Sequence, residues 1–299
     1  MARSLLKETM IDSELIYAYA KCGQRYLPDL ETFISEPNQA DIQKCGDKCY
    51  DDKLFEAARI LYSQVGNNQK LAQVLVKLKQ YAAAFDAAKK ADIPKVWKEV
   101  CFACVRAKEF RTANLCGMKI IILPDHLEDL IKHYEKYGFN DELVSLLEQG
   151  MSLERSHQGI YTELGILYAK YQPIRLMDHI RTYAQKIQIP KLVRACEQYQ
   201  MWAETVFLHA QYGQFDQAVA TMMDHSPTSW KHDLFSHNIV KVSNYDLYYR
   251  AMIFYLEEEP MLLNDLLKLL AMKIDLTKCV QVMKRTGHIA LITPFLKSV

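Results

Sequence analysis

Two pairs of closely spaced cysteines are the residues in this sequence whose types and spacing first suggest chemistry. Cys101 and Cys104 form a C-x-x-C pattern, and Cys45 and Cys49 form a second close pair. A structural zinc site needs four converging ligands, and neither pair has a second C-x-x-C or a histidine pair at suitable spacing. A thioredoxin-like redox centre needs a strand–helix–strand context, which is missing here. We therefore interpret both pairs as buried core cysteines and predict neither a metal site nor a cofactor.

Three histidines near one another in the sequence are the next candidates for a ligand set: His225, His232 and His237. They flank a Ser-Pro-Thr turn and lack the i, i+4 spacing with a glutamate that marks a zinc protease. We interpret them as solvated turn residues.

Acidic residues that could act in pairs occur at Glu163, Asp178 and residues 257–259. A glycosidase or protease site also needs a pocket and a partner group, so solvated helical faces explain these carboxylates better. The sequence contains no G-x-S-x-G, P-loop or H-E-x-x-H motif. We predict that the protein is not an enzyme and has no catalytic residues.

The elements that carry the C-x-x-C pattern are helical. Residues 97–117 (WKEVCFACVRAKEFRTANLCG) begin with apolar side chains at i, i+3, i+4, i+7 and i+8, the stripe of an amphipathic helix. A second short helix follows, in which we expect Phe110, Ala113, Leu115 and Cys116 to face inward. Two short antiparallel helices cannot bury both apolar faces alone, so neighbouring pairs must stack on them.

An aromatic residue recurs at nearly regular intervals along the chain. We expect it to open the second helix of successive pairs, at Phe55, Tyr81, Phe110, Phe139 and Tyr168. Three of the four intervals are equal and the first is slightly shorter. A period of about 30 residues in helix–turn–helix units indicates an α-solenoid, whereas a helical bundle would show longer helices without a fixed period.

Composition narrows the class of protein further. The 37 Lys and Arg balance 36 Asp and Glu, so the net charge gives no reason to expect nucleic acid or an anionic membrane surface as a partner. Eight cysteines in 299 residues are typical of reduced, buried thiols in a cytosolic protein. We find no secretory signal and no apolar run long enough to cross a bilayer, so membrane association is expected to be indirect.

The sequence resembles the clathrin heavy-chain family, in the part of the leg built from its repeats. The resemblance runs through all 299 residues and is carried by residues 97–117 together with YDDKLFEAARILY, GMSLERSHQGIYTELGILYAK and YYRAMIFYLEEEPMLLNDLL. It implies the proximal leg near the knee of a triskelion, without the N-terminal propeller, most of the distal leg and the trimerisation end. We also expect the similarity to continue upstream of Met1.

Taken together, these observations predict an all-α fold, a right-handed α-solenoid. Short antiparallel helix hairpins that repeat every ~30 residues would form one continuous superhelical rod over residues 1–299. Within it, the resemblance implies the end of one clathrin heavy-chain repeat at residues 1–117, a full repeat at 118–264 and the start of a third at 265–299.

The resemblance also implies partners and contact residues. Expected partners are the clathrin light chain, other heavy chains in triskelion and lattice contacts, and a membrane reached only through adaptors; no nucleic acid is expected. A basic residue that the family uses to hold the light chain matches Lys170, whereas a second one is replaced here by Glu259. Arg3 and Lys7 correspond to a basic patch at the knee that meets an acidic motif of the light chain.

The function that the resemblance implies is that of a structural leg segment in coated-vesicle formation, endocytosis and intracellular vesicle transport. Its expected location is the cytoplasm, on the cytoplasmic face of coated pits and coated vesicles. Two alternatives remain open at this point: a subunit of a vesicle-tethering complex that shares the repeat, and a generic helical-repeat adaptor that binds short peptides.

Overall fold

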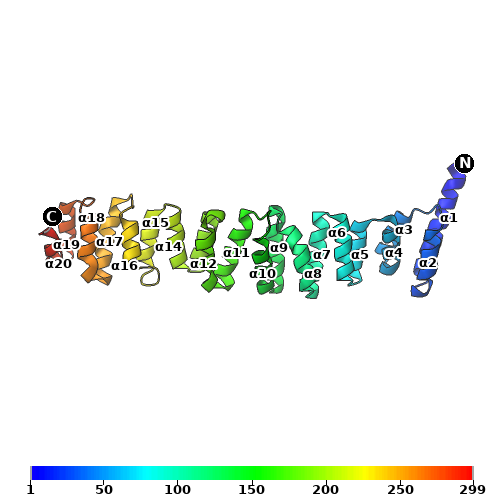
Figure 1. Ribbon diagram of the computed structural model, residues 1–299, viewed down its shortest axis with the longest axis horizontal. Coiled ribbons are helices and arrows are strands. Elements are labelled where there is room, and N and C mark those ends of the chain that lie inside the picture. The colour runs from blue at the N-terminus through cyan, green and yellow to red at the C-terminus, as the bar shows by residue number, and fades with distance from the viewer. Residues whose placement is uncertain (1, 298–299) are drawn as a thin grey trace. The chain divides into compact units, whose positions relative to one another are not determined.

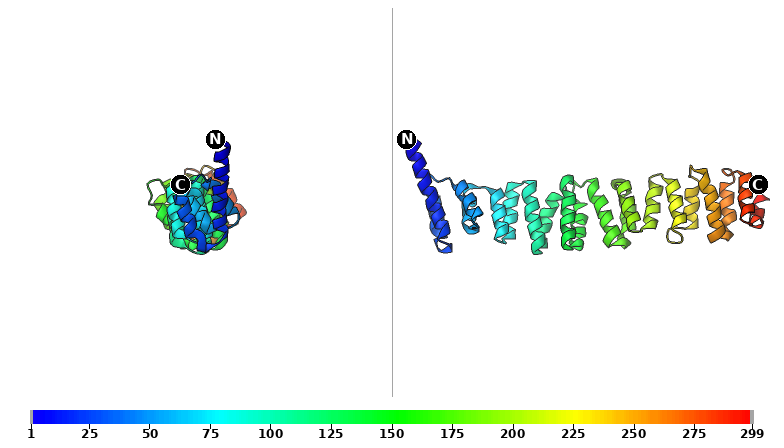
Figure 2. Two further views of the ribbon diagram at one scale, coloured as in Figure 1. Left: turned by 90° about the vertical axis from the view of Figure 1, so that its right-hand side faces the viewer. Right: turned by 180° about the vertical axis from the view of Figure 1, so that it is seen from behind.

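A computed structural model describes residues 2–297 of the chain, with side chains from residue 9 onward. Twenty α-helices and four short 3-10 helices make up this range, and no strand occurs within it. The chain divides into two compact units, Met1–Ile160 and Tyr161–Val299. Within each unit the helices follow one another in chain order as short neighbouring rods (Figures 1 and 2).

The first unit is built from short helices that pack mainly against their neighbours in the sequence. Its described helices are α1 (Ala2–Lys21), η1 (Gln24–Tyr26), α2 (Leu27–Ser35), α3 (Ile42–Asp51), α4 (Phe55–Val65), α5 (Asn68–Lys77), α6 (Tyr81–Ala91), α7 (Pro94–Ala107), α8 (Phe110–Ile120), α9 (Pro124–Tyr137) and α10 (Asn140–Gly150).

The second unit continues the same pattern, and its first helix begins three residues before the boundary. Its helices are α11 (Gln158–Tyr171), η2 (Pro173–Arg175), α12 (Leu176–Tyr183), η3 (Ala184–Lys186), α13 (Ile189–Gln198), α14 (Trp202–Gln211), α15 (Phe215–Asp224), α16 (His232–Ile239), α17 (Tyr245–Glu258), η4 (Pro260–Leu262), α18 (Leu263–Leu270), α19 (Leu276–Arg285) and α20 (Ile289–Leu296).

One type of tight turn joins the helices of many hairpins. Lys79, Lys108 and Gly138 have left-handed backbones, with φ of 60°, 63° and 74°. The next residue donates its amide to the carbonyl five positions back, at 2.9 Å from Gln80 to Leu75. This bond satisfies a helix C-terminal carbonyl with main-chain atoms, as in the Schellman motif. A left-handed backbone conformation recurs at the same position of equivalent turns, at Lys53, Gln200, Gly213 and Gly287.

The core between hairpins combines small residues with large rings. Ala84, Ala88 and Ala113 are fully buried, so that the backbones of neighbouring helices approach closely. Trp97 of α7 is only 3% exposed and its ring centroid lies 5.5 Å from that of Phe85 in α6. The apolar stripe expected on residues 97–105 therefore forms a buried face.

Polar contacts on the surface connect one hairpin with the next. Lys48 of α3 pairs with Glu14 of α1 at 3.2 Å, and comparable ion pairs recur at later steps of the stack. Each exposed ion pair contributes roughly 0–1 kcal/mol to the free energy of unfolding. The main role of these pairs is therefore to favour one register between neighbouring hairpins. The later pairs are Lys70–Asp47, Lys98–Asp129, Lys191–Glu163, Arg250–Asp224 and Lys278–Asp246.

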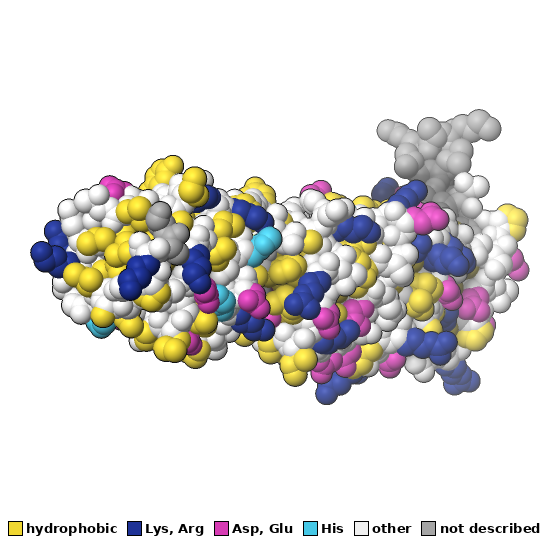
Figure 3. Space-filling model, turned by 60° about the vertical axis from the view of Figure 1, so that its left-hand side comes forward, with side chains coloured by type: hydrophobic (Ala, Val, Ile, Leu, Met, Phe, Trp, Pro, Cys, Tyr) yellow, Lys and Arg dark blue, Asp and Glu magenta, His cyan; other side chains and the backbone are white. Residues whose placement is uncertain are grey.

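Apolar side chains gather on the surface of the last helices of the second unit, as the space-filling view shows (Figure 3). Met272 is 98% exposed, and Leu269, Ile289, Leu291 and Leu296 are each more than one third exposed. An apolar helix face of this kind is typical of repeats that bury their surface against a neighbour.

The prediction of an all-α solenoid of short helix hairpins is confirmed. Phe55, Tyr81 and Phe110 open α4, α6 and α8, and Phe139 immediately precedes α10. The prediction for Tyr168 is wrong, because this residue lies inside α11, the first helix of its pair. The assignment of residues 1–117, 118–264 and 265–299 to successive repeats stays a prediction.

Leu115 is a second correction. Although it was expected to face inward, its side chain is 49% exposed, while Ala113 and Cys116 are fully buried. At about 100° per residue, Leu115 points away from the direction that Cys116 and Ile120 share. Across the described residues, no helix combines the length and the apolar character that crossing a bilayer requires.

Candidate functional site

The two cysteine pairs lie in the hydrophobic core, as predicted. Cys49, Cys101 and Cys104 are 0% exposed, and Cys45 is 5% exposed. Burial raises the pKa of the Cys104 thiol to about 12, and it also raises the pKa of Cys101. These groups are therefore neutral thiols at physiological pH, as expected for buried core cysteines. Among the described residues, no group of three or more His, Cys, Asp or Glu is placed to hold a metal ion.

The three histidines near residue 230 contact different partners. His225 stacks on Trp202 with ring centroids 3.4 Å apart, and Nδ1 of His232 lies 3.0 Å from the hydroxyl of Tyr255. Only His237 is exposed, and its Nε2 lies 2.7 Å from Nζ of Lys241. The interpretation as solvated turn residues is wrong for His225 and His232, because both rings pack on aromatic rings of neighbouring helices.

The acidic candidates are also spread over separate surfaces. Glu163 accepts a hydrogen bond from Lys191 of the following hairpin, which makes it part of the contacts between hairpins. Asp178, Glu257 and Glu258 are exposed on α12 and α17. The placements of Asp178, Glu257 and Glu258 agree with solvated helical faces, whereas the Glu163 side chain is only 18% exposed.

Lys170 and Glu259 lie at two structurally equivalent junctions of the second unit. Lys170 is exposed near the end of α11, with Nζ 4.9 Å from the centroid of the Tyr171 ring. Glu259 is half-buried and directly follows α17. In both places a 3-10 helix that begins with proline, η2 or η4, leads into the next α-helix.

The backbone shows how closely the two junctions correspond. Gln172 has φ and ψ of −138° and 61°, and Glu259 has −140° and 60°. The amide of each donates to a carbonyl four residues back, at 2.9 Å from Gln172 and 3.0 Å from Glu259. Gln172, directly before Pro173, is therefore the positional equivalent of Glu259, while Lys170 lies two residues earlier.

Each junction also presents an apolar side chain that our sequence reasoning missed. Ile174 in η2 is 93% exposed and Met261 in η4 is 88% exposed. Both follow the proline of their 3-10 helix, so a Pro-apolar pair after a long helix was the available signal. Exposed apolar side chains beside charged ones are characteristic of surfaces that bind proteins.

Arg3 and Lys7 belong to α1, but their side chains lie outside the described residues. Their proposed part in a basic patch at the knee stays a prediction.

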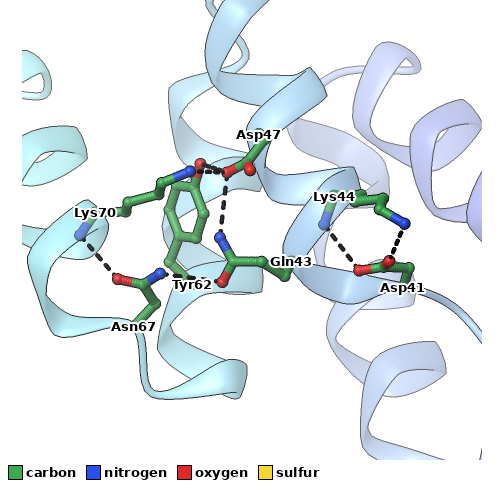
Figure 4. Close-up of polar contacts among 7 residues, drawn as sticks. All are labelled: Asp41, Gln43, Lys44, Asp47, Tyr62, Asn67 and Lys70. Carbon is green, nitrogen blue, oxygen red and sulfur yellow. Dashed lines mark hydrogen bonds and ion pairs between the residues drawn. The ribbon is translucent and has the colours of Figure 1, made fainter.

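A polar network in the first unit was not foreseen from the sequence (Figure 4). Oδ1 of Asp47 accepts hydrogen bonds from the Tyr62 hydroxyl at 2.6 Å, from Nζ of Lys70 at 2.5 Å and from Nε2 of Gln43 at 3.2 Å. Oε1 of Gln43 in turn accepts from Nδ2 of Asn67 at 3.1 Å. The network joins α3, α4 and the start of α5, so it fixes one hairpin against the next.

The network changes the acidity of its members. Burial raises the pKa of the Asp47 carboxyl, but hydrogen bonds from Lys70 and Tyr62 outweigh it and hold that pKa below its ordinary value. Burial and the hydrogen bond to Asp47 both raise the pKa of Tyr62, which therefore remains a neutral donor. The arrangement stabilises an ionised Asp47 and leaves no reactive group.

Replacing Asp47 by asparagine (Asp47→Asn) is expected to remove an acid-sensitive part of the free energy of unfolding. Because the folded carboxyl has the lower pKa, its stabilising contribution is complete above the ordinary carboxyl pKa and is lost as the pH falls through the folded value. At neutral pH the free energy of unfolding of wild type should exceed that of the variant. The difference should shrink as the solution is made acidic, and urea denaturation at a series of pH values from neutral to acid measures it. Asp86→Asn, an exposed site on α6, is the control. A difference that stays constant with pH would contradict this account.

Comparison with known proteins provides the remaining observation. Residues 1–112 and 119–263 match the family model described as "Clathrin: Region in Clathrin and VPS". The whole chain is 50% identical to clathrin heavy chain 1 of Arabidopsis thaliana, 48% identical to the clathrin heavy chain of Drosophila melanogaster and 46% identical to clathrin heavy chain 2 of Homo sapiens. It spans 17% of the length of the first of these relatives and 18% of the other two.

Proposed function

This chain belongs to the clathrin family, and from that premise we propose that it is a structural leg segment of the clathrin coat without catalytic activity. The observation that carries the proposal is similarity to clathrin heavy chains over all 299 residues, together with helical hairpins throughout the described range. A stack of hairpins suits a load-bearing role, because each hairpin contacts mainly its neighbours and stability accumulates along the chain.

In the coat, the segment packs against the legs of other heavy chains in the polyhedral lattice. Many weak contacts along a leg add through multivalency, so the lattice assembles and is also dismantled. This places the protein on the cytoplasmic face of coated pits and coated vesicles, where it supports endocytosis and vesicle transport. It reaches the membrane only through adaptors.

The segment also binds the clathrin light chain, along a line that includes the α11–α12 and α17–α18 junctions. Lys170 supplies positive charge for an acidic partner, and Ile174 offers an exposed apolar contact beside it. At the second junction Glu259 replaces the basic residue, while Met261 is 88% exposed. Docking there depends on apolar contact with Met261, or on a basic residue of the light chain.

Charge reversal at Lys170 tests the docking line. Because the side chain is exposed, Lys170→Glu is expected to weaken binding of the same organism's light chain by about 0–1 kcal/mol at physiological salt. The loss should grow at low ionic strength, where exposed charges are less screened. Titration of purified light chain into both proteins over a salt series measures the effect.

Lys278→Glu is the matched control, because Lys278 is an exposed lysine of the same unit on α19 and pairs with Asp246 at 3.7 Å. If Lys170→Glu binds the light chain at low salt with the same affinity as wild type, Lys170 is not part of the docking site. No light-chain binding by wild type would leave leg packing as the function of the segment.

A vesicle-tethering subunit is the second candidate, because the matched family is described as a region in both clathrin and VPS proteins. Self-association separates the two functions. A full-length chain containing this segment should form cages with light chain if it is a coat protein, and should join a hetero-oligomeric complex without cages if it is a tether. A generic peptide-binding adaptor would do neither.

A further inference from the structure

We propose that two adjoining hollows over α5 and α7 in the first unit bind a short acidic peptide of a partner protein. One apolar side chain of the peptide enters the first hollow, and its flanking carboxylates lie over the second. This site is separate from the light-chain docking line, which is proposed at α11–α12 and α17–α18.

The first hollow is large enough for one side chain, and its walls combine apolar residues with Gln73, Lys77, Glu99 and Arg106. It has a volume of about 350 Å³, and its walls include Tyr50, Val76, Val96 and Phe102 from three successive hairpins. Its one acidic residue, Glu99, accepts a hydrogen bond from Nε2 of Gln73 at 2.7 Å. A cavity of this size accommodates a single leucine or aromatic side chain, which is how many peptide-binding grooves anchor their ligands.

The second hollow adjoins the first and is basic. It measures about 720 Å³ and shares Val76, Lys77 and Arg106 with the first, so a peptide can extend from one into the other. Lys79 also lines it, and Lys108 follows its wall residue Ala107.

These four cations, Lys77, Lys79, Arg106 and Lys108, are exposed, and none forms an ion pair with a residue that the structure describes. Glu109 is the only acidic residue that lines the second hollow. The local charge is therefore positive, although the chain as a whole carries a formal net charge of only +1. An acidic segment complements such a surface.

Two of the four cations, Lys79 and Lys108, lie in left-handed turns. Lys79 and Lys108 have φ of 60° and 63°, whereas the equivalent turn before α10 has glycine, Gly138. A left-handed conformation costs a side-chain-bearing residue about 1–2 kcal/mol, which glycine avoids. Glycine is therefore the substitution that removes both charges without straining these turns.

Between the two polyanions that fit a basic surface, the details favour peptide over nucleic acid. A peptide can place its few carboxylates beside the cations and away from Glu99 and Glu109, whereas a continuous phosphate backbone carries a charge at every step. The apolar walls of the first hollow lie beside the cations, which matches a peptide with one apolar side chain between carboxylates. Exposed ion pairs are individually weak, so binding should be modest and sensitive to salt.

Fluorescence anisotropy with labelled synthetic peptides tests the proposal. The probes carry a central Leu, Phe or Trp between pairs of Asp, and each has a twin in which Asn replaces Asp. We expect at least one acidic probe to bind wild type at low salt in preference to its neutral twin. The double variant Lys79→Gly/Lys108→Gly should bind it roughly five- to tenfold more weakly, the effect of losing two exposed ion pairs.

The same variant separates binding from folding. Because glycine suits the left-handed turn, its Tm should rise while its affinity falls, an outcome that a purely structural role does not give. Lys89→Gln/Lys90→Gln removes the same charge from the far end of α6 and should leave affinity unchanged.

Three outcomes would overturn the proposal. They are failure of every acidic probe to bind better than its neutral twin, equal binding by wild type and Lys79→Gly/Lys108→Gly, and preference for single-stranded RNA over the acidic probes. Because the assay uses the chain alone, none of these outcomes depends on coat assembly or on the light chain.

Discussion

Trp97→Ala is expected to lower the free energy of unfolding of the first unit by about 3–5 kcal/mol. The side chain is 3% exposed and packs on Phe85, and its Nε1 donates to Oδ1 of Asp92 at 3.2 Å. Removal of the indole leaves a cavity between α6 and α7 that the rigid hairpins fill only in part. The Asp92 acceptor also loses its partner.

Urea denaturation followed by circular dichroism measures this loss. Leu115→Ala on the adjoining helix is the control, because its side chain is 49% exposed and the change should cost less than about 1 kcal/mol. Equal effects of the two substitutions would show that Trp97 is not an anchor of the stack.

Gly46→Ala is expected to destabilise the first unit by about 1–3 kcal/mol, although it adds one methyl group to a helix. A Cβ atom at this position would lie 2.8 Å from Cε1 of Tyr62. The ring has little freedom to move away, because its hydroxyl donates to Asp47 at 2.6 Å. Close packing and the polar network therefore act on the same side chain.

A double-mutant cycle identifies the cause. In a Tyr62→Phe background the ring keeps its size but loses the bond to Asp47, so Gly46→Ala should cost less there than in wild type. Strict additivity of the two substitutions would rule out the network as the reason for the intolerance.

Much of the helical fold could be predicted from local patterns. Pro94 and Pro124 occupy the first positions of α7 and α9, where proline is favoured, and Gly138 ends α9 in a left-handed conformation. The prediction for Tyr168 failed because the regular spacing of the aromatic residues was assumed to continue past α10, where the regular short turns between helices end. A longer connection separates α10 from α11, and this shifts the phase of the repeat.

Features that depend on tertiary structure were not accessible in this way. The hydrogen bonds of the Asp47 network join residues up to 24 positions apart, and nothing in the local sequence pairs Gln43 with Asn67. Lys79 and Lys108 lack the glycine that marks a left-handed turn, so their conformation follows from the hairpin geometry.

For the candidate docking residues, sequence reasoning indicated positions and the structure supplied their surroundings. Lys170 and Glu259 were chosen by family resemblance, and their equivalent junctions appear only in three dimensions. The exposed Ile174 and Met261 near them could not be identified from composition, because apolar residues occur both in the core and on the surface of the described range.

The tight turns between helices are closed by main-chain hydrogen bonds, with Lys, Gln or Gly at the left-handed position. Substitution among these residue types therefore alters surface charge while the main-chain bonds that close the turn are kept. Surface charge along the stack can therefore be redesigned through single substitutions at hairpin turns, without rebuilding the scaffold.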